Sequence, residues 1–361
     1  MMKRRLIYLM LPLLAWGLTL TSCIRDEIAE CPPMRITVSV KDKNYFNVDE
    51  VAAKGLIEKM DEDLPFRDYV RTLYYVIHDE AGNVVLEQTN REVDNDDREQ
   101  VIDLPASLPY GKYRVTVWGN MKSDRPLGDD PATAELEHTD AAQNDIYLAD
   151  YELDYRLGSE HHTVALERTK GRLIITAEGL PDYIDFSEKT VHDIYSIINS
   201  SFEYSELVNL TSQTEWTQRN EMMTHTLLGP SREYEKSKLE VDFYDRGTLG
   251  RSVRMLTPDD IQITMGRNEL TVVKYIFVEQ GGEEPDPDDP DPDPDDPDNP
   301  DPDEPDNPDP DEPDNPDPDE PDNPDPDEPD NPDPDEPVEG KFYIYVLVND
   351  NWEMVHKMEI D

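Results

Sequence analysis

The stretch Lys112–Trp118, KYRVTVW, decides the class of fold. Polar and apolar side chains alternate along it, and the turn-forming residues Pro109, Tyr110 and Gly111 come directly before it. Alternation with a period of two places every second side chain on one face of a β-strand, whereas a helix needs a period near 3.6. The stretch therefore predicts a β-strand with one buried face.

Similar β-forming runs recur along most of the chain. We expect further strands at 35–40, 73–78, 84–86, 100–104, 162–167, 172–176, 194–204, 238–244, 261–265, 270–278, 342–348 and 352–358. The last two flank Asn349-Asp350-Asn351, a sequence that suits a β-hairpin turn. In the first half, apolar residues fall at helical spacing only over Asp49–Met60. Because helices do not alternate with the strands, the pattern predicts an all-β fold of two consecutive β-sandwiches.

Charge and cysteine content exclude several classes of protein. The 361 residues include 84 acidic and 33 basic side chains, which gives a net charge of -51, and only two cysteines. This charge balance excludes a nucleic-acid-binding protein that uses a basic face. The cysteine count excludes a disulfide-stapled mini-domain.

Much of the negative charge lies in one segment near the C-terminus. Glu283–Pro337 contains 29 acidic residues and 21 prolines, and its core repeats the octet DPDEPDNP four times from Asp301. Proline restricts φ and removes hydrogen-bond donors, and like charges repel, so we expect a disordered polyproline II insert. At about 3.1 Å per residue it would reach roughly 170 Å.

The insert separates the C-terminal hairpin from the rest of its domain, and two arrangements follow. In the first, the hairpin packs on its own chain, at a closure cost of roughly 2 kcal/mol relative to a short loop. Burial of several apolar side chains of 342–352 exceeds this cost, which favours the first arrangement. In the second, the hairpin is presented on the tether to a partner protein.

The N-terminus indicates export and lipidation. Three basic residues precede an apolar run, Leu6–Leu20, that is too short to span a bilayer and is typical of a signal peptide. Leu20-Thr21-Ser22-Cys23 resembles a bacterial lipobox, so we expect Cys23 to be the lipidated first residue of the mature chain. The alternative is an ordinary signal peptide with an incidental cysteine. With Cys23 lipidated, Cys31 has no partner for an intramolecular disulfide.

These features divide the chain into six parts. They are a lipoprotein signal peptide (1–22), a lipid-anchored segment (23–33), an N-terminal sandwich (34–168), the first part of a second sandwich (169–282), the acidic insert (283–337) and a hairpin that completes the second sandwich (338–361).

Several short motifs are shared with a known family. They are the lipobox ending at Cys23, Cys31-Pro32, DEAGNVV at 79–85, LPYGKY at 108–113 followed by WGN at 118–120, and VNDNW at 348–352. In order and spacing they resemble the FimB-like fimbrial anchor lipoproteins of Gram-negative anaerobes. The acidic insert departs from that pattern.

The resemblance implies a fold and a function. The expected fold is two transthyretin-like β-sandwich domains. The expected function is to anchor a fimbrium in the outer membrane and limit its length, with fimbrial subunits bound by exchange of β-strands. Ile24-Arg25-Asp26-Glu27 is similar to a surface-export signal of such lipoproteins, which implies exposure at the cell surface. The sequence does not assign the exchange groove to either domain.

Catalytic and ligand-binding motifs are weak. The spacing of Asp291, Asp293 and Asp295 is similar to the start of a calcium loop but lacks the later glycine and glutamate. His161 and His162 are adjacent and point to opposite faces of a strand, which argues against a shared metal. We therefore expect no enzyme activity, cofactor, metal, nucleic acid or small-molecule substrate.

Tryptophan and tyrosine leave one alternative function open. Trp118 and Trp352 each lie at the end of an expected strand, where they are expected to pack in a core or at a strand rim. If they were exposed, together with some of the 18 tyrosines, they would form platforms for a ligand. The alternative is therefore a surface lipoprotein that captures glycan or a host protein.

Overall fold

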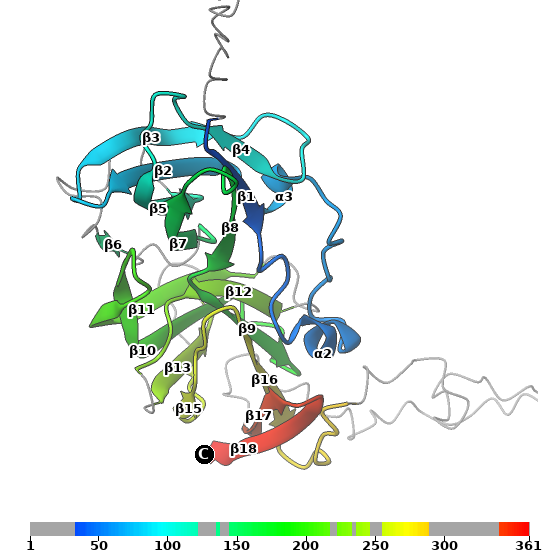
Figure 1. Cartoon of the computed structure of the whole chain (residues 1–361). Helices are drawn as coiled ribbons and strands as arrows, with labels where there is room; N and C mark the ends of the chain where they lie inside the picture. Colours follow the sequence, from blue (N-terminus) through cyan, green and yellow to red (C-terminus); the bar gives the residue numbers. More distant parts are fainter. Residues whose placement is uncertain are drawn as a thin grey trace, which may run out of the picture.

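Strands make up almost all of the regular structure in the computed structural model of the chain (Figure 1). The structure describes residues 33–121, 135–137, 144–216, 222–232, 236–245, 255–288 and 339–360. Within them lie the short helices α2 (Val48–Ala53) and α3 (Phe66–Tyr69). The predicted all-β class is confirmed.

Seven strands enclose the first hydrophobic core. They are β1 (Arg35–Val40), β2 (Thr72–Asp79), β3 (Val84–Glu92), β4 (Gln100–Asp103), β5 (Gly111–Gly119), β7 (Tyr147–Tyr155) and β8 (His161–Arg168), in the order β3-β2-β5-β7-β8-β1-β4. Only two residue pairs join β7 to β8, so the sheet folds over on itself there. The KYRVTVW stretch is β5, and Val115 and Val117 are fully buried from its alternating face.

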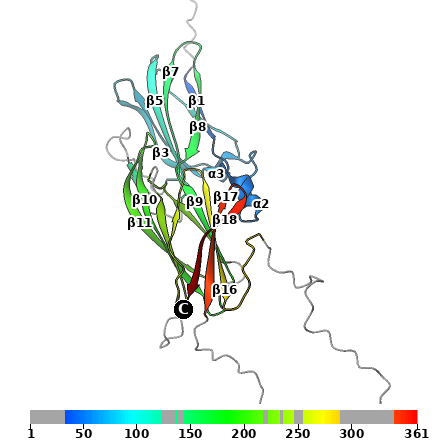
Figure 2. The ribbon, with the colours of Figure 1, turned by 90° about the horizontal axis from the view of Figure 1, so that it is seen from below.

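Two sheets enclose the second core. One has the order β11-β10-β13-β14, with β15 also paired to β13, and the other has the order β12-β9-β16-β17-β18. The strands are β9 (Gly171–Glu178), β10 (Phe186–Asn199), β11 (Tyr204–Glu215), β12 (Met222–Leu228), β13 (Ser237–Tyr244), β14 (Met255–Leu256), β15 (Ile261–Ile263), β16 (Leu270–Glu279), β17 (Gly340–Val348) and β18 (Asn351–Ile360). Figure 2 shows β5 and β7 toward one end of the molecule and β16–β18 toward the other.

A buried arginine joins the two halves. Arg168, at the end of β8, is 3% exposed, and its Nε donates to Asp145 Oδ2 (2.7 Å). Its guanidinium also donates to Asn268 Oδ1 (2.8 Å) and lies 4.1 Å from the ring centroid of Tyr45. Asn268 lies in the loop before β16, whereas Asp145 precedes β7, so the ion pair and its hydrogen bonds bridge both bodies.

The tip of the β10–β11 hairpin makes a second junction. Ile198 is fully buried and packs with Phe202 against Trp118 on the outer face of β5. The hydroxyl of Tyr204 donates to the carbonyl of Thr169 (2.7 Å), between β8 and β9. The short strand β6 (Glu135–Glu137), from the β5–β7 connection, pairs with the end of β10.

Two predicted elements differ from the structure. The helix predicted at Asp49–Met60 ends at Ala53, because Gly55 follows in a left-handed conformation with φ of +71°. The strand predicted at 194–204 combines the end of β10 with the first residue of β11. Between them Asn199 Oδ1 accepts from the backbone N–H of Ser201 (2.9 Å) and of Glu203 (3.0 Å), which closes a turn.

The C-terminal hairpin packs on its own chain. β17 pairs with β16 from Val273↔Val346 to Glu279↔Gly340, and Phe342 and Ile344 are fully buried in the second core. This agrees with the first of the two arrangements expected from the sequence. Residues 289–338, most of the acidic insert, lie outside the described residues, so its predicted disorder stays a prediction.

The first residues of the insert lie across the outer face of this sheet. Lys274 Nζ donates to the carbonyl of Pro287 (3.0 Å), and the Tyr345 hydroxyl donates to the carbonyl of Pro285 (3.2 Å). Asp288 forms an ion pair with Lys54, directly after α2. The start of the insert therefore runs from the β16–β17 end toward α2.

Candidate strand-binding groove

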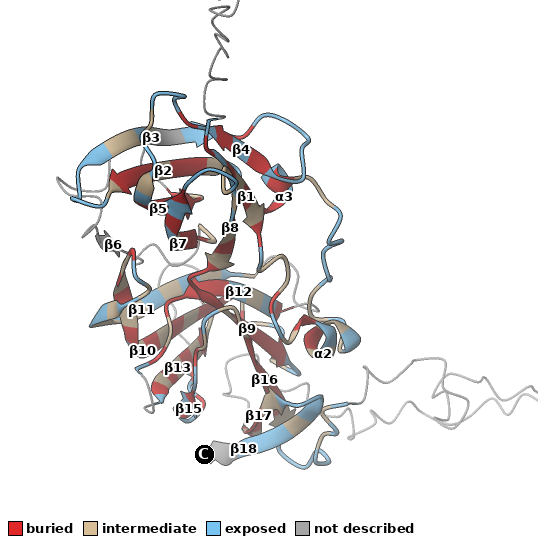
Figure 3. Cartoon of the chain, in the orientation of Figure 1, coloured by how far each residue is buried: buried red, intermediate tan, exposed pale blue. Residues whose placement is uncertain are grey.

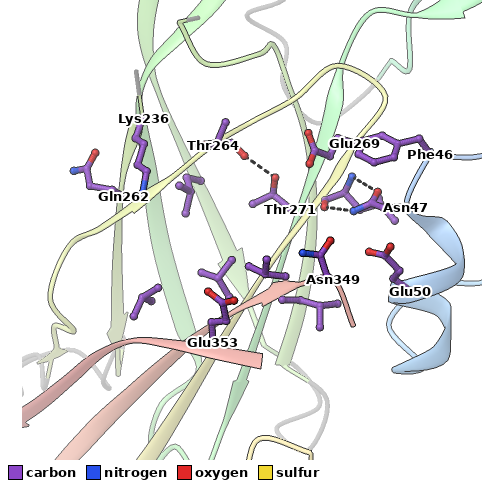
Figure 4. Close-up of a pocket in the computed structure, with 16 residues that line it drawn as sticks. Phe46, Asn47, Glu50, Lys236, Gln262, Thr264, Glu269, Thr271, Asn349 and Glu353 are labelled. Carbon is purple, nitrogen blue, oxygen red and sulfur yellow. Dashed lines mark hydrogen bonds between the residues drawn. The ribbon is translucent and has the colours of Figure 1, made fainter. Parts of the chain in front are cut away.

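An open groove lies where β15 faces the β17–β18 hairpin and α2. Its volume is about 360 Å³. Apolar residues form much of its lining: Phe46, Ile263, Leu270, Val346, Leu347, Val348 and Val355. Figure 4 shows β15 on one side of this space, the hairpin below it and α2 on the far side.

The groove is open because two sheet edges end there. Among the described strands, β14 and β15 pair only with β13, and β18 pairs only with β17. Four of the first five side chains of β18 are exposed, and Figure 3 shows this strand in the exposed colour. An unpaired edge presents backbone N–H and C=O groups that a further strand can satisfy. The groove can therefore accept an extended peptide as an added strand.

Asn47 fixes α2 at one end of the groove. Its side-chain amide donates to the carbonyl of Leu270 (2.8 Å), and its carbonyl oxygen accepts from the N–H of Leu270 (2.9 Å) (Figure 4). The amide thus replaces a neighbouring strand at the first residue of β16. On the same strand, the Thr271 hydroxyl donates to the carbonyl of Thr264 (2.9 Å). These bonds position the groove's floor rigidly.

Acidic side chains line the α2 and β18 sides of the groove. Glu50 comes from α2, Glu269 from the residue before β16, and Glu353 from β18. Partial burial raises the pKa of Glu269. Lys236 lies on the opposite side, near Gln262 (Figure 4).

One end of the first core is closed, although among the described strands β3 and β4 each pair on one side only. Phe66 and Tyr69 of α3 belong to the first core, together with Ile102 of the edge strand β4. The N–H of Phe66 donates to the carbonyl of Asp97 (2.9 Å), and the N–H of Val93 to the carbonyl of Arg71 (2.8 Å). α3 and the segment before β4 therefore close this end of the core.

The residues singled out in the sequence lie away from the groove or outside the described structure. Cys23, Cys31 and Asp291–Asp295 fall outside the described residues. His161 and His162 pair with successive residues of β1 in a parallel ladder, so they lie on opposite faces. Within the described ranges, no group of three metal-ligating side chains gathers. No helix in that part of the chain is long and apolar enough to cross a membrane.

The two tryptophans pack as the sequence predicted. Trp118 is fully buried between β5 and the β10–β11 tip. Trp352 is half-buried against Leu347 on the outer face of the β12-β9-β16-β17-β18 sheet. Lys274 Nζ lies 5.6 Å from its ring centroid. Neither forms an open aromatic platform, so no observation favours the glycan-capture alternative.

A family comparison agrees with the resemblance seen in the motifs. Residues 28–151 match the family model of fimbrillin-A associated anchor proteins Mfa1 and Mfa2. Over these residues, about a third of the chain, the protein is similar to that family. The match spans the strands from β1 into β7. Among curated proteins there is no match.

Solved structures that are similar to this chain include proteins from three bacteria. A candidate adhesin from Bacteroides ovatus is 13% identical, with 72% of this chain and 91% of that chain covered and a TM-score of 0.45. A fimbrial assembly protein from Parabacteroides distasonis is 12% identical, with coverage of 67% and 90% and a TM-score of 0.39. The fimbrial anchor protein Mfa2 from Porphyromonas gingivalis is 13% identical, with coverage of 69% and 92% and a TM-score of 0.39.

Proposed function

We propose that this protein is an outer-membrane lipoprotein that anchors a fimbrium to the cell surface and limits its length. The family match over residues 28–151 is the observation that carries the proposal. Fimbrial structural subunits are the expected partners. The family consists of anchor proteins, and we propose a binding function without enzyme activity. Two tandem transthyretin-like domains are part of the same proposal.

Lipid on Cys23 attaches the protein to the membrane. The lipobox motif ending at Cys23 supports this step. A multiply acylated cysteine holds a protein to a bilayer far more firmly than a single chain does. The described structure begins at residue 33, close to β1.

Fimbrial subunits bind by adding a strand at the groove of the second sandwich. Two observations support this location: the edges of β15 and β18, which have no further partner among the described strands, and the apolar lining between them. Main-chain hydrogen bonds would supply affinity, and alternate side chains would enter the groove.

Comparison of two cysteine variants tests the anchor. In cells that carry Cys23→Ala, we expect the protein and its fimbriae in the culture medium. In cells that carry the control Cys31→Ala, both stay on the cell. In cells without the protein we expect longer fimbriae, measured by electron microscopy of shed material. Fimbriae that remain attached and unchanged in length in the Cys23→Ala cells would contradict the proposal.

A further inference from the structure

The groove combines an apolar floor with two carboxylates that form no ion pair with the described residues. Val346, Val348 and Val355 supply apolar surface, and the latter two are 37% and 46% exposed. In the described part of the chain, neither Glu269 nor Glu353 forms an ion pair or a side-chain hydrogen bond. Other acidic side chains on the described strands, such as Asp150 and Glu167, do have an arginine partner.

Glu353 points toward the space that an added strand would fill. It pairs directly across β17–β18 with Val346, and directly opposed residues share one face of a sheet. Val346 packs against the second core, so this face is the one turned toward the other sheet. The next inward residue, Val355, lines the same groove.

Glu269 lies at the other end of the same floor and is partly buried. Its backbone carbonyl accepts from the N–H of Arg172 (2.9 Å), which holds it at the start of β16. Its carboxylate lies directly beside Gly266. A Cβ atom added to Gly266 would lie only 1.9 Å from Oε2 of Glu269. A partly desolvated carboxylate gains more from a neighbouring cation than an exposed one does.

We propose that the strand bound in the groove carries two basic side chains, lysine or arginine, one paired with Glu353 and one with Glu269. This inference rests on the proposed strand-binding function and names its partner more closely. The apolar side chains of the strand lie over Val346 and Val355, and its cations lie at the two ends of the floor, beside Glu353 and Glu269. The acidic insert cannot be this strand, because Glu283–Pro337 contains no basic residue.

Three labelled nine-residue peptides test the charge. Each alternates valine and threonine, with lysine, norleucine or glutamate as both the third and the seventh residue, which share one face of the strand. Binding is measured by fluorescence anisotropy. We expect the lysine peptide to bind about five- to tenfold more tightly than the norleucine peptide, because two carboxylates each contribute a modest ion pair. The glutamate peptide should bind more weakly than both, and 0.5 M salt should remove most of the difference.

Protein variants separate the inference from the function on which it rests. The double variant Glu269→Gln, Glu353→Gln should lose the lysine preference and still bind the norleucine peptide. The exposed Glu80→Gln should keep the preference, and thermal unfolding checks that both variants fold. Equal binding of the lysine and norleucine peptides overturns the inference alone. Failure of all three peptides overturns strand binding at the groove, and the inference with it.

Discussion

Removal of the acidic insert should stabilise the second sandwich. The N–H of Gln280 donates to the carbonyl of Glu339 (2.9 Å), and Glu279 pairs with Gly340, so the insert is the loop of the β16–β17 hairpin. Deletion of residues 289–338 keeps the segment that contacts Lys274, Tyr345 and Lys54. The deletion therefore removes loop length and negative charge but none of these contacts.

Loop-closure entropy sets the size of the effect. About 60 residues separate the paired ends in the full chain and about 10 in the deletion, so the closure cost falls by about 1.6 kcal/mol. Release of the repulsion between the acidic residues and the acidic body adds to this at low salt. We therefore expect the free energy of unfolding of the second sandwich to rise by about 1.5 to 2 kcal/mol.

Urea unfolding, followed through tryptophan fluorescence, measures the change. A matched control replaces residues 289–338 with a glycine–serine segment of equal length, which should leave stability within about 0.5 kcal/mol of the full chain at high salt. A deletion that lowers stability would refute the reasoning, because it would mean that these residues make contacts that stabilise the fold.

Three further predictions concern buried charge and the groove edge. Lys189 Nζ donates to Thr224 Oγ1 (2.8 Å), and burial lowers the pKa of Lys189 to about 8. The pKa of Lys189 is lower in the folded than in the unfolded protein, so the unfolded state binds more protons between pH 8 and 10. The free energy of unfolding of the wild type, measured in denaturant, should therefore rise over this range, and that of Lys189→Met should not. Asp145→Asn should lower the free energy of unfolding, measured in denaturant, by roughly 3 kcal/mol, because Arg168 stays buried without its counter-charge. Loss of the exposed Arg35–Asp103 pair, as a control, should lower it by less than about 0.5 kcal/mol. Val355→Lys should leave the melting temperature within about 2 °C and abolish binding of the lysine peptide.

The strands were predictable from the sequence where both the pattern and the partner were local. Alternation in 112–118 reports one buried face directly, and β5 follows it. The 49–60 helix was overextended because apolar residues continue at helical spacing past Gly55. Leu56 and Ile57 still pack beside Val51 on the sheet that contains β9 and β16, but they lie outside the helix.

The groove was not predictable because its parts are distant in sequence. Phe46–Glu50, Gln262–Thr271 and Val346–Val355 meet only when β16 lies beside β17 and α2 crosses from the first half. Asn47 is the residue that joins them, and its only signal was a polar amide before a short helix. An open strand edge has no residue signature of its own, since the backbone supplies the binding groups.

Photo-crosslinking in living cells tests the central claim most directly. A benzophenone amino acid replaces Val355 in the groove, and the control replaces Val84 on the edge strand β3, which is similarly exposed at 48% against 46%. Purification through a C-terminal tag and mass spectrometry then identify what is attached. The account predicts that the Val355 probe, and not the Val84 probe, captures an extended segment of a β-rich fimbrial subunit. Capture of a fimbrial subunit from Val84 alone, or of none from Val355, would contradict it.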